Sequence, residues 1–590
     1  MLFSVLCFAI GRIVNKKHLL EKVLRIMDEI IYWNQHETTL FAVEELRRLM
    51  RNAGYECTIT DSGRSSSHIE NSNRKIHLIT TNEYHATCKD KKIITINDDG
   101  FALFKSSNDV WIIGNEARSI LYGVYMYCRI RFGYEWTRLD EERIVDKDIP
   151  THEQLYIHEP MFARRGNIIE TINDPNYINA LIDWGVKNGQ NEYFFTFFLW
   201  NDIKSYVSST LRKRNVHVTL GGHSLSFLLN EIQEKTSDSE LKQNDKLKFF
   251  AENTKLQDKV IQKIVDICME NEVITRVSLW PEDIGIDEKN GSEFLPTYIR
   301  FTEKLKEALQ KNKSQVGVEY IVYNAGLSWN MLERKEQMES SYHVDVLYAF
   351  WGRDYSTSID SNEPKQKRAY ETLQDWNKEA IKKGRSLTVL EYYSDHFMLS
   401  ELFPPLLTRI QQDLHDYKKL NIQGVLNLIV PTHQKRKHPE IEENYPWKWI
   451  HHFNNYLYAR IAWGEEYKDV VEEYFNVLNE DKEAFQQLFI ELEKLISQHT
   501  KWNAPLFPAR LVDPEKVQDR LNYPQIPLYL REVYKRLAEW DLTETESLLA
   551  IQTKDNLTSF TTKEMMLIYF YYLKEVAGIH AEAWTLEVEH

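Results

Sequence analysis

Cysteine and glycine are both scarce in this chain, which has 5 Cys and 21 Gly among 590 residues. The cysteines are widely scattered and form no CxxC pair, which argues against a disulfide framework and against a zinc site. No glycine-rich phosphate loop follows the first buried strand of the central region, so a doubly wound nucleotide-binding sheet is disfavoured. We therefore expect reduced cysteines, no metal and no cofactor.

A basic surface and a long apolar run are also missing. The formal net charge is −15, and the short basic segment at 433–438 does not provide the face that a nucleic-acid backbone requires. The apolar start, MLFSVLCFAIGRIVNKK, is too short to span a bilayer and has no A-x-A-like cleavage site. We expect a cytoplasmic protein that binds neither nucleic acid nor membrane, with a first β-strand in this segment; a degenerate export signal is the alternative.

The length and the 43% of apolar residues predict a globular protein of two to four domains. Residues 1–155 predict a small α/β domain. The segment 36–55 has the apolar spacing of a helix, and 74–81, 91–98 and 109–115 have the pattern of short strands. A second helix is expected to follow and to end at Gly133.

From about residue 160 the pattern changes to continuous apolar strands that alternate with amphipathic helices. Such strands are typical of a parallel sheet covered by helices, and eight of them predict a (β/α)₈ barrel. The predicted barrel spans 156–450, and 451–590 are expected to form an all-α C-terminal domain. The eight predicted strands are 163–170, 192–200, 216–222, 274–280, 317–324, 344–351, 386–393 and 424–431.

Carboxylates and aromatic residues recur at the ends of these strands. In such a barrel the carboxyl ends of the strands form the active-site face. Cleavage of a glycosidic bond requires this mixture, because one acid protonates the leaving oxygen, a second carboxylate acts on water or carbon, and aromatic faces carry the sugar ring. The strand ends in question are Glu170, Trp200-Asn201-Asp202, Gly222-His223, Glu282-Asp283, Tyr323-Asn324, Trp351 to Asp354, Glu391 to Tyr393, and Pro431 to His433.

The segment GNEARSILYGVY at 114–125, followed by the barrel and helical patterns, resembles the α-glucuronidases of glycoside hydrolase families 67 and 115 and related uncharacterised glycosidases. The resemblance to family 67 implies a general acid at Glu282, in the context VSLWPE. It implies a pair of carboxylates that activate water in an inverting mechanism, Asp354 in GRDY and Glu391 in LEYY. The fifth-strand glutamate of family 115 has no counterpart, because Ala325 occupies that position.

Two lysines that hold the sugar carboxylate in the glucuronidases are missing at the matching positions, Ser278 and Ala349. We therefore expect an inverting glycoside hydrolase acting on a neutral or amino sugar of an oligosaccharide, unless Arg353 binds a carboxylate from another direction. Two alternatives stay open. One is a retaining, substrate-assisted N-acetylhexosaminidase that uses Glu282 with Asp283, and the other is a carbohydrate-binding protein without activity.

The candidates for substrate contact are less specific than the three carboxylates. Each tryptophan could equally pack between loops, His223 could be a hydrogen-bonded core residue, and Arg353 beside Asp354 also suits a structural ion pair. The expected partner is an oligosaccharide, and a homodimer stays open. The full set of substrate-binding candidates is Asp283, His223, Trp200, Asn201, Trp351, Arg353, Tyr392, Asn324 and Arg165.

Overall fold

The computed structural model describes two compact units of the chain. The first comprises residues 1–136, 142–160 and 212–215, and the second comprises 137–141, 161–211 and 216–590. The residues that the structure describes are 28–64, 74–87, 94–107, 109–139, 141–145, 155–233, 249–250, 254–281, 288–323, 340–350, 353–399, 403–430, 452–497, 526–543, 545 and 560–588. The strand expected in the first residues of the chain lies outside this set.

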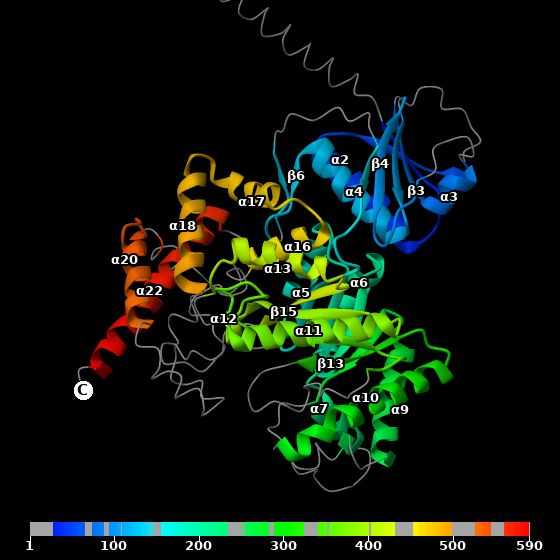
Figure 1. The fold of residues 1–590 in the computed structure, drawn as a ribbon. Coiled ribbons are helices and arrows are strands. Elements are labelled where there is room, and N and C mark those ends of the chain that lie inside the picture. Colours follow the sequence, from blue (N-terminus) through cyan, green and yellow to red (C-terminus); the bar gives the residue numbers. More distant parts are fainter. Residues whose placement is uncertain are drawn as a thin grey trace, which may run out of the picture. The chain divides into compact units, whose positions relative to one another are not determined.

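The first unit is a six-stranded sheet with helices on both faces, with α2 and α4 on one face and α3 on the other (Figure 1). The predicted strands 74–81 and 109–115 are present. The one at 91–98 is wrong in its described part, because residues 94–98 form no strand. In sheet order the strands are β2 (Cys57–Asp61), β1 (Asp28–Tyr32), β3 (Arg74–Thr80), β5 (Asp109–Gly114), β4 (Phe101–Ser106) and β8 (Tyr156–His158); the helices are α2 (Glu37–Asn52), α3 (Thr81–Thr87) and α4 (Ala117–Phe132), and the strands β6 (Tyr134–Glu135) and β7 (Arg143–Ile144) form a separate pair.

The segment 114–125 has a structural role in this unit. Arg118 is buried and donates to Oδ1 of Asp99 over 2.6 and 2.9 Å. Gly123 lets α4 approach the sheet closely, since a Cβ there would lie 2.7 Å from Ile112. The helix ends at Gly133, whose φ of 73° lies in the left-handed region that glycine tolerates. The contacts of this segment therefore hold α4 against the sheet, and its role in this unit is structural.

The second unit contains a closed barrel of eight parallel strands, which confirms the predicted fold class. Each of the eight predicted strands is present within a few residues of its expected bounds. Around the barrel the strands are β9 (Arg164–Ile169), β10 (Glu192–Thr196), β11 (His217–Gly222), β12 (Ile274–Leu279), β13 (Gly317–Tyr323), β14 (Asp345–Ala349), β15 (Leu387–Asp395) and β16 (Gly424–Val430).

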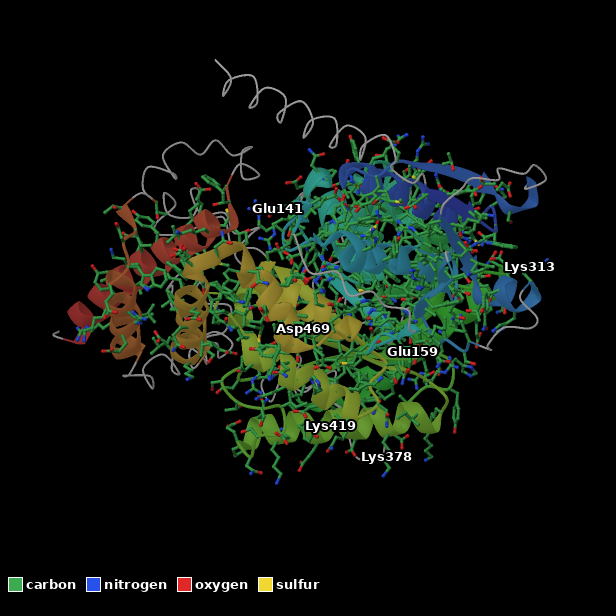
Figure 2. The ribbon with its side chains drawn as sticks, turned by 90° about the horizontal axis from the view of Figure 1, so that it is seen from above. Glu141, Glu159, Lys313, Lys378, Lys419 and Asp469 are labelled. Atoms are coloured by element: carbon green, nitrogen blue, oxygen red, sulfur yellow. The ribbon has the colours of Figure 1, made fainter. Side chains whose placement is uncertain are left out.

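Helices follow the strands and form the outer layer of the barrel. Charged side chains such as Lys378 and Lys419 lie exposed on these helices (Figure 2). Two of the helices start with a side-chain cap and a proline: Asp174 accepts from the backbone of Tyr177 before α5, and Glu363 caps α11 in the same way. The helices are α5 (Pro175–Lys187), α6 (Phe197–Lys213), α7 (Leu225–Gln233), α9 (Thr254–Glu270), α10 (Glu288–Lys311), α11 (Pro364–Lys382), α12 (His396–Leu399) and α13 (Leu407–Lys419).

Helix α16 (His452–Trp463) also belongs to the outer layer. Its Tyr458 hydroxyl donates to the carbonyl of Gly166 in β9 over 3.0 Å, and Asn455 bonds to Asn167 and Asn427 of β9 and β16. The predicted start of a C-terminal domain at 451 therefore comes before a helix that covers the barrel. The remaining helices are α17 (Tyr467–Phe475), α18 (Lys482–Ile496), α20 (Ile526–Ala538) and α22 (Thr562–Val588), with the 3₁₀ segment η3 (Asn476–Asp481) between α17 and α18.

A hydrogen-bonded polar layer occupies the inside of the barrel near the amino ends of its strands. Arg164 donates to Glu192 over 2.6 and 2.8 Å and to Glu319 over 2.7 Å. Thr219 donates to Glu192, and Arg276 pairs with Asp345 at 2.7 Å. These contacts involve six of the eight strands, β9 to β14, at the face opposite to the expected active site.

Strand packing at the other end of the barrel leaves no room for a side chain at Gly221. A Cβ at this position would lie 1.7 Å from the carbonyl oxygen of Ser278. We expect Gly221→Ala to lower the free energy of unfolding by about 1–3 kcal/mol or more, because neighbouring backbone would have to move. Gly317→Ala is the matched control, since its Cβ would meet nothing closer than 3.4 Å. Urea denaturation of both variants checks this; equal losses would contradict it.

Candidate functional site

The carboxyl ends of β9 to β12 bring an acid and several rings to the inside of the barrel. Trp280 is buried and packs against Phe194 at 5.1 Å between ring centroids. Its indole nitrogen donates to Oγ of Ser278 over 3.0 Å. The half-buried Glu170 follows β9, and a Cβ on Gly222 would lie 3.0 Å from its Oε1. Glu170 therefore lies close to the packed rings of Trp280 and Phe194, which we call the aromatic wall.

His223 connects this wall to the segment that follows the fourth strand. It comes directly after Gly222, whose φ of 64° ends β11 in the left-handed region. Its Nδ1 lies 3.0 Å from the carbonyl oxygen of Pro281, and its ring packs edge-on against Trp280 at 5.3 Å. A carbonyl only accepts, so Nδ1 carries the proton of this contact. His223 thereby fixes the residue before Glu282.

Four of the predicted site residues lie outside the described part of the chain. They are Glu282, Asp283, Asn324 and Trp351. Their backbone neighbours are described at the carboxyl ends of three strands: Pro281 follows β12, Tyr323 ends β13 and Phe350 follows β14. The roles predicted for these four residues stay predictions.

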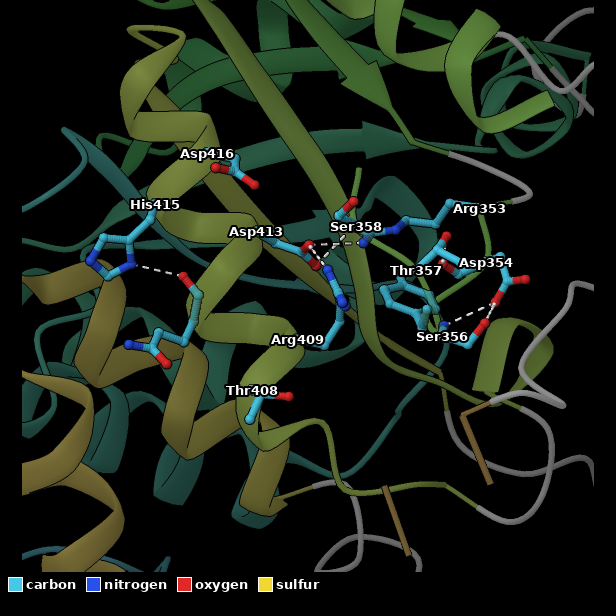
Figure 3. Close-up of polar contacts among 12 residues, drawn as sticks. Arg353, Asp354, Ser356, Thr357, Ser358, Thr408, Arg409, Asp413, His415 and Asp416 are labelled. Carbon is cyan, nitrogen blue, oxygen red and sulfur yellow. Dashed lines mark hydrogen bonds and ion pairs between the residues drawn. The ribbon is translucent and has the colours of Figure 1, made fainter. Parts of the chain in front are cut away.

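Glu391 and Arg353 form a buried ion pair, with both side chains fully shielded from solvent. Nη1 of Arg353 lies 2.6 Å from Oε1 of Glu391, and its Nη2 donates to Asp413 of α13 over 2.9 Å. Tyr355 donates to Oε2 of Glu391 over 2.7 Å, and Tyr417 of α13 donates to Oε1. Figure 3 shows Arg353 extended toward Asp413, with Arg409 reaching the same carboxylate.

This network lies on the outer side of the barrel wall. Glu391 pairs in register with Asn427 of β16, which pairs with Asn167 of β9. Paired residues of neighbouring strands project to the same face of a sheet, and both asparagines bond to Asn455 of the outer helix α16. Glu391 therefore projects outward, between the barrel strands and the outer helices, where water and substrate have no access. We correct its predicted role as a base accordingly.

The same geometry corrects the predicted substrate contact of Arg353. Its guanidinium is buried in the network and stacks over Tyr355 at 4.4 Å, so it cannot hold a sugar carboxylate. The structural ion pair that the sequence left open is present, with Glu391 and Asp413 as the partners. Asp354 is half-buried beside it, and its Oδ1 accepts from the backbone and hydroxyl of Ser356 over 2.9 and 2.6 Å. The predicted role of Asp354 in activating water stays a prediction.

Burial, together with the negative charge of Glu391, raises the pKa of Asp413 to about 6. The positive charges of Arg353 and Arg409 act in the opposite direction. The folded state therefore holds this proton more tightly than the unfolded chain, whose carboxyl has a pKa of about 3.8. The resulting stability is present below about pH 4 and is lost as the pH rises to about 6. We expect Asp413→Asn to remove this loss, so that its Tm relative to the wild type rises between pH 4 and 7.

Differential scanning calorimetry across this pH range measures the effect. Asp416→Asn is the control on the same helix, because Asp416 is partly exposed and pairs with Lys419 at the surface. We expect its Tm difference from the wild type to stay constant between pH 4 and 7. If the Tm of Asp413→Asn and that of the wild type changed in parallel between pH 4 and 7, the raised pKa of Asp413 would be contradicted.

Three further candidates lie away from the inside of the barrel. The predicted strand 192–200 ends at Thr196, so Trp200 and Asn201 belong to α6. Trp200 is buried against Phe195 at 5.9 Å, and Asn201 is exposed and accepts from Lys204. Arg165 is fully buried and donates to the carbonyl oxygens of 162, 163 and 189. Trp200 and Arg165 are buried among the elements outside the barrel strands, Trp200 in α6 and Arg165 against Trp463 of α16, which excludes the predicted sugar contacts. The predicted contact of Asn201 stays a prediction.

Tyr392 directly follows the outward-facing Glu391 in β15 and is buried, and its predicted sugar contact stays a prediction. Two carboxylates at the barrel mouth were missing from the prediction, Glu170 and Asp395. Glu170 was noted as a strand end but not chosen. Asp395 was passed over because β15 runs two residues beyond its predicted end and contains an irregularity. Only the register of the strands reveals on which side it lies.

Within the described ranges, no group of three His, Cys, Asp or Glu side chains is arranged to hold a metal ion. The same part of the chain contains no helix that is long and apolar enough to cross a membrane.

Comparison with known proteins shows a likeness of the N-terminal part of the chain to a glycoside hydrolase family. The family model described as "Glycosyl hydrolase family 67 N-terminus" matches residues 12–127. The "Probable alpha-glucuronidase A" of Aspergillus niger is 33% identical over 75 residues, which are 13% of this chain and 9% of that protein. The match thus spans less than a tenth of the length of this curated relative. The predicted resemblance to the family 67 enzymes is confirmed in this N-terminal part.

Solved structures resemble the chain over a longer range. A GH138 enzyme targeting pectin rhamnogalacturonan II superimposes with a TM-score of 0.53 and 11% identity, over 93% of this chain and 69% of that chain. At this identity the likeness shows the fold alone. A β-N-acetylhexosaminidase from Bacteroides fragilis NCTC 9343 aligns at a TM-score of 0.45 and 11% identity, over 80% of this chain and 92% of that one; this likeness is too weak to bear on function.

Proposed function

We propose that this protein is a glycoside hydrolase that cleaves an O-glycosidic bond of an oligosaccharide in the mouth of its barrel. The observation that supports this most is the combination of a family 67 N-terminal match at residues 12–127 with a closed (β/α)₈ barrel. In such barrels catalytic side chains come from the carboxyl ends of the strands. Glu170 and the aromatic wall around Trp280 lie at that end.

In the proposed reaction Glu282 is the general acid. It follows Pro281, whose carbonyl oxygen contacts His223, so the backbone that leads to Glu282 is anchored beside the aromatic wall. A protonated Glu282 would donate its proton to the glycosidic oxygen as the bond to the anomeric carbon breaks. A carboxylate on the other side of the sugar ring would take a proton from the attacking water, and Asp354 is one candidate for this role.

The proposed substrate carries a neutral or amino sugar rather than a uronate. Ser278 takes the place of one of the glucuronidase lysines, and its hydroxyl accepts from Trp280 instead of offering a positive charge. The second position is Ala349, a small buried residue. Arg353, the remaining cation considered for the clamp, is held by Glu391 and Asp413. The carboxylate of a uronate would therefore face protein carboxylates at the barrel mouth, without a cation at any of these three positions to neutralise it.

A screen of aryl glycosides tests the proposal. The panel contains neutral, amino, N-acetylamino and uronic sugars in both anomers, and release of the phenol is measured with the wild-type protein. We expect hydrolysis of at least one neutral or amino glycoside and none of the glucuronides. Cleavage of glucuronides alone would contradict the substrate class. Binding of a glycan without cleavage of any substrate would favour the carbohydrate-binding alternative.

The substrate-assisted alternative makes a different demand. In that mechanism the acetamido group of the sugar attacks the anomeric carbon, so Asp283 would orient it and only N-acetylated sugars would react. Hydrolysis restricted to N-acetylglycosides in the screen would therefore favour the pair of Glu282 and Asp283 over the water-activating mechanism.

A further inference from the structure

Strand β15 contains one extra residue relative to its neighbour. Glu391 lies opposite Asn427 of β16, and Ser394 lies opposite Ile429. Between these two pairs β15 thus advances by three residues while β16 advances by two. An extra residue in one strand of a pair is a β-bulge, and beyond it the side chains change the face to which they project. The carboxylates on the two sides of this bulge need not point the same way.

Before the bulge, Glu391 projects to the outer side, as its contacts with α13 show. Beyond the bulge, Ser394 lies opposite Ile429, which lies opposite Ile169 of β9. Ile169 is two residues after Asn167, whose side chain reaches an outer helix, so this row of residues faces outward. Asp395 is one residue further along. It therefore projects to the inside of the barrel.

Asp395 also stands at the correct height for a reaction in the barrel mouth. It is the last residue of β15, and its residue-to-residue partner on β16 is Val430. Glu170 is the residue that follows Ile169 on the next strand, which puts the two acids in one layer with Val430 between them. Two strand spacings separate their α-carbons, about 10 Å. Asp395 is only 1% exposed.

We propose that Asp395, rather than Glu391, is the carboxylate of the seventh barrel strand that activates water. This inference rests on the proposed glycosidase function. The carboxylate of Asp395 takes a proton from water while the water oxygen bonds to the anomeric carbon. The bond from that carbon to the glycosidic oxygen breaks, its electron pair stays on this oxygen, and Glu282 supplies the proton. Asp395 then returns its proton to solvent as Glu282 is reprotonated.

The test compares three variants of the full chain on an aryl glycoside that the wild type hydrolyses. Asp395→Asn keeps the shape of the side chain, and its kcat is expected to fall by about 10²–10⁴-fold. Asp395→Ala leaves room for a small anion, so azide is expected to restore turnover and to yield a glycosyl azide of inverted configuration. Glu391→Gln removes the buried carboxylate instead; we expect a lowered Tm and no rescue by azide.

Three results would overturn the inference. The first is a kcat for Asp395→Asn within about threefold of the wild type. The second is a glycosyl azide formed by Glu391→Gln and not by Asp395→Ala. The third is loss of activity in both Asp395 variants together with a lowered Tm and no azide product, which would assign Asp395 a structural role only. If the wild type cleaves no glycoside at all, the proposed function fails, and the inference fails with it.

Discussion

Replacement of Arg164 by methionine is expected to lower the free energy of unfolding of the barrel by about 3–5 kcal/mol. Arg164 is held inside the barrel by Glu192 and Glu319, both almost fully shielded from solvent. Methionine fills a similar volume but leaves two carboxylates without their cation. Urea denaturation followed by tryptophan fluorescence measures the loss. Because the layer lies at the amino ends of the strands, we expect kcat at low temperature to change little.

Arg385→Met is the matched control at the same end of the barrel. Arg385 approaches Asp345 only to 4.0 Å and is 36% exposed, so its removal is expected to change the stability by about 0–1 kcal/mol.

The dependence of stability on acid pH provides a second check. Arg164 lowers the pKa of Glu192 to about 2 from 4.5, against the effect of burial. The stability from this pair is thus present above about pH 4.5 and is lost as the pH falls toward 2. Equal stability of Arg164→Met and Arg385→Met would contradict the account.

The second large effect concerns activity. Glu282→Gln is expected to lower kcat by about 10²–10⁴-fold on substrates with a poor leaving group, because glutamine cannot donate the proton that the glycosidic oxygen needs. The loss is expected to shrink for a dinitrophenyl glycoside, whose leaving group departs without protonation. Steady-state kinetics on both substrates measures the two losses.

Glu270→Gln is the control for this variant. Glu270 is exposed at the end of α9, directly before the same strand that leads to Glu282. We expect its kcat and KM to equal those of the wild type on both substrates. A Glu282→Gln variant that retained full activity on the poor leaving group would remove Glu282 from the reaction, even if the barrel mouth remained the site.

The order of the strands could be read from the sequence, whereas the direction of their side chains could not. Apolar runs separated by amphipathic helices have few interpretations, and all eight barrel strands are present. The side on which Glu391 and Asp395 project depends on a single extra residue in β15, and no local pattern in LEYYSDHF marks it. A carboxylate in an apolar run indicated a purpose or a partner, and for Glu391 the partner is Arg353.

The misplaced candidates were missed because a strand end and long-range contacts cannot be read from local sequence. The second strand stops at Thr196, four residues earlier than its apolar pattern, because the apolar run continues into the buried face of α6. Trp200 therefore packs inside the helix layer instead of at the barrel mouth. Arg353 was considered for a sugar carboxylate, yet Glu391 and Asp413 neutralise it, and Arg165 donates to the carbonyl oxygen of Gly189. Such contacts depend on the tertiary fold and cannot be read from local sequence.

The configuration of the first product tests the central claim most directly. Proton NMR during hydrolysis of the best aryl glycoside resolves the anomeric signal before mutarotation mixes the two anomers. An acid on one side of the sugar and a water-activating carboxylate on the other predict a first product with the anomer opposite to that of the substrate. A first product of retained configuration would contradict this account and would require a nucleophile from the protein or from the substrate itself.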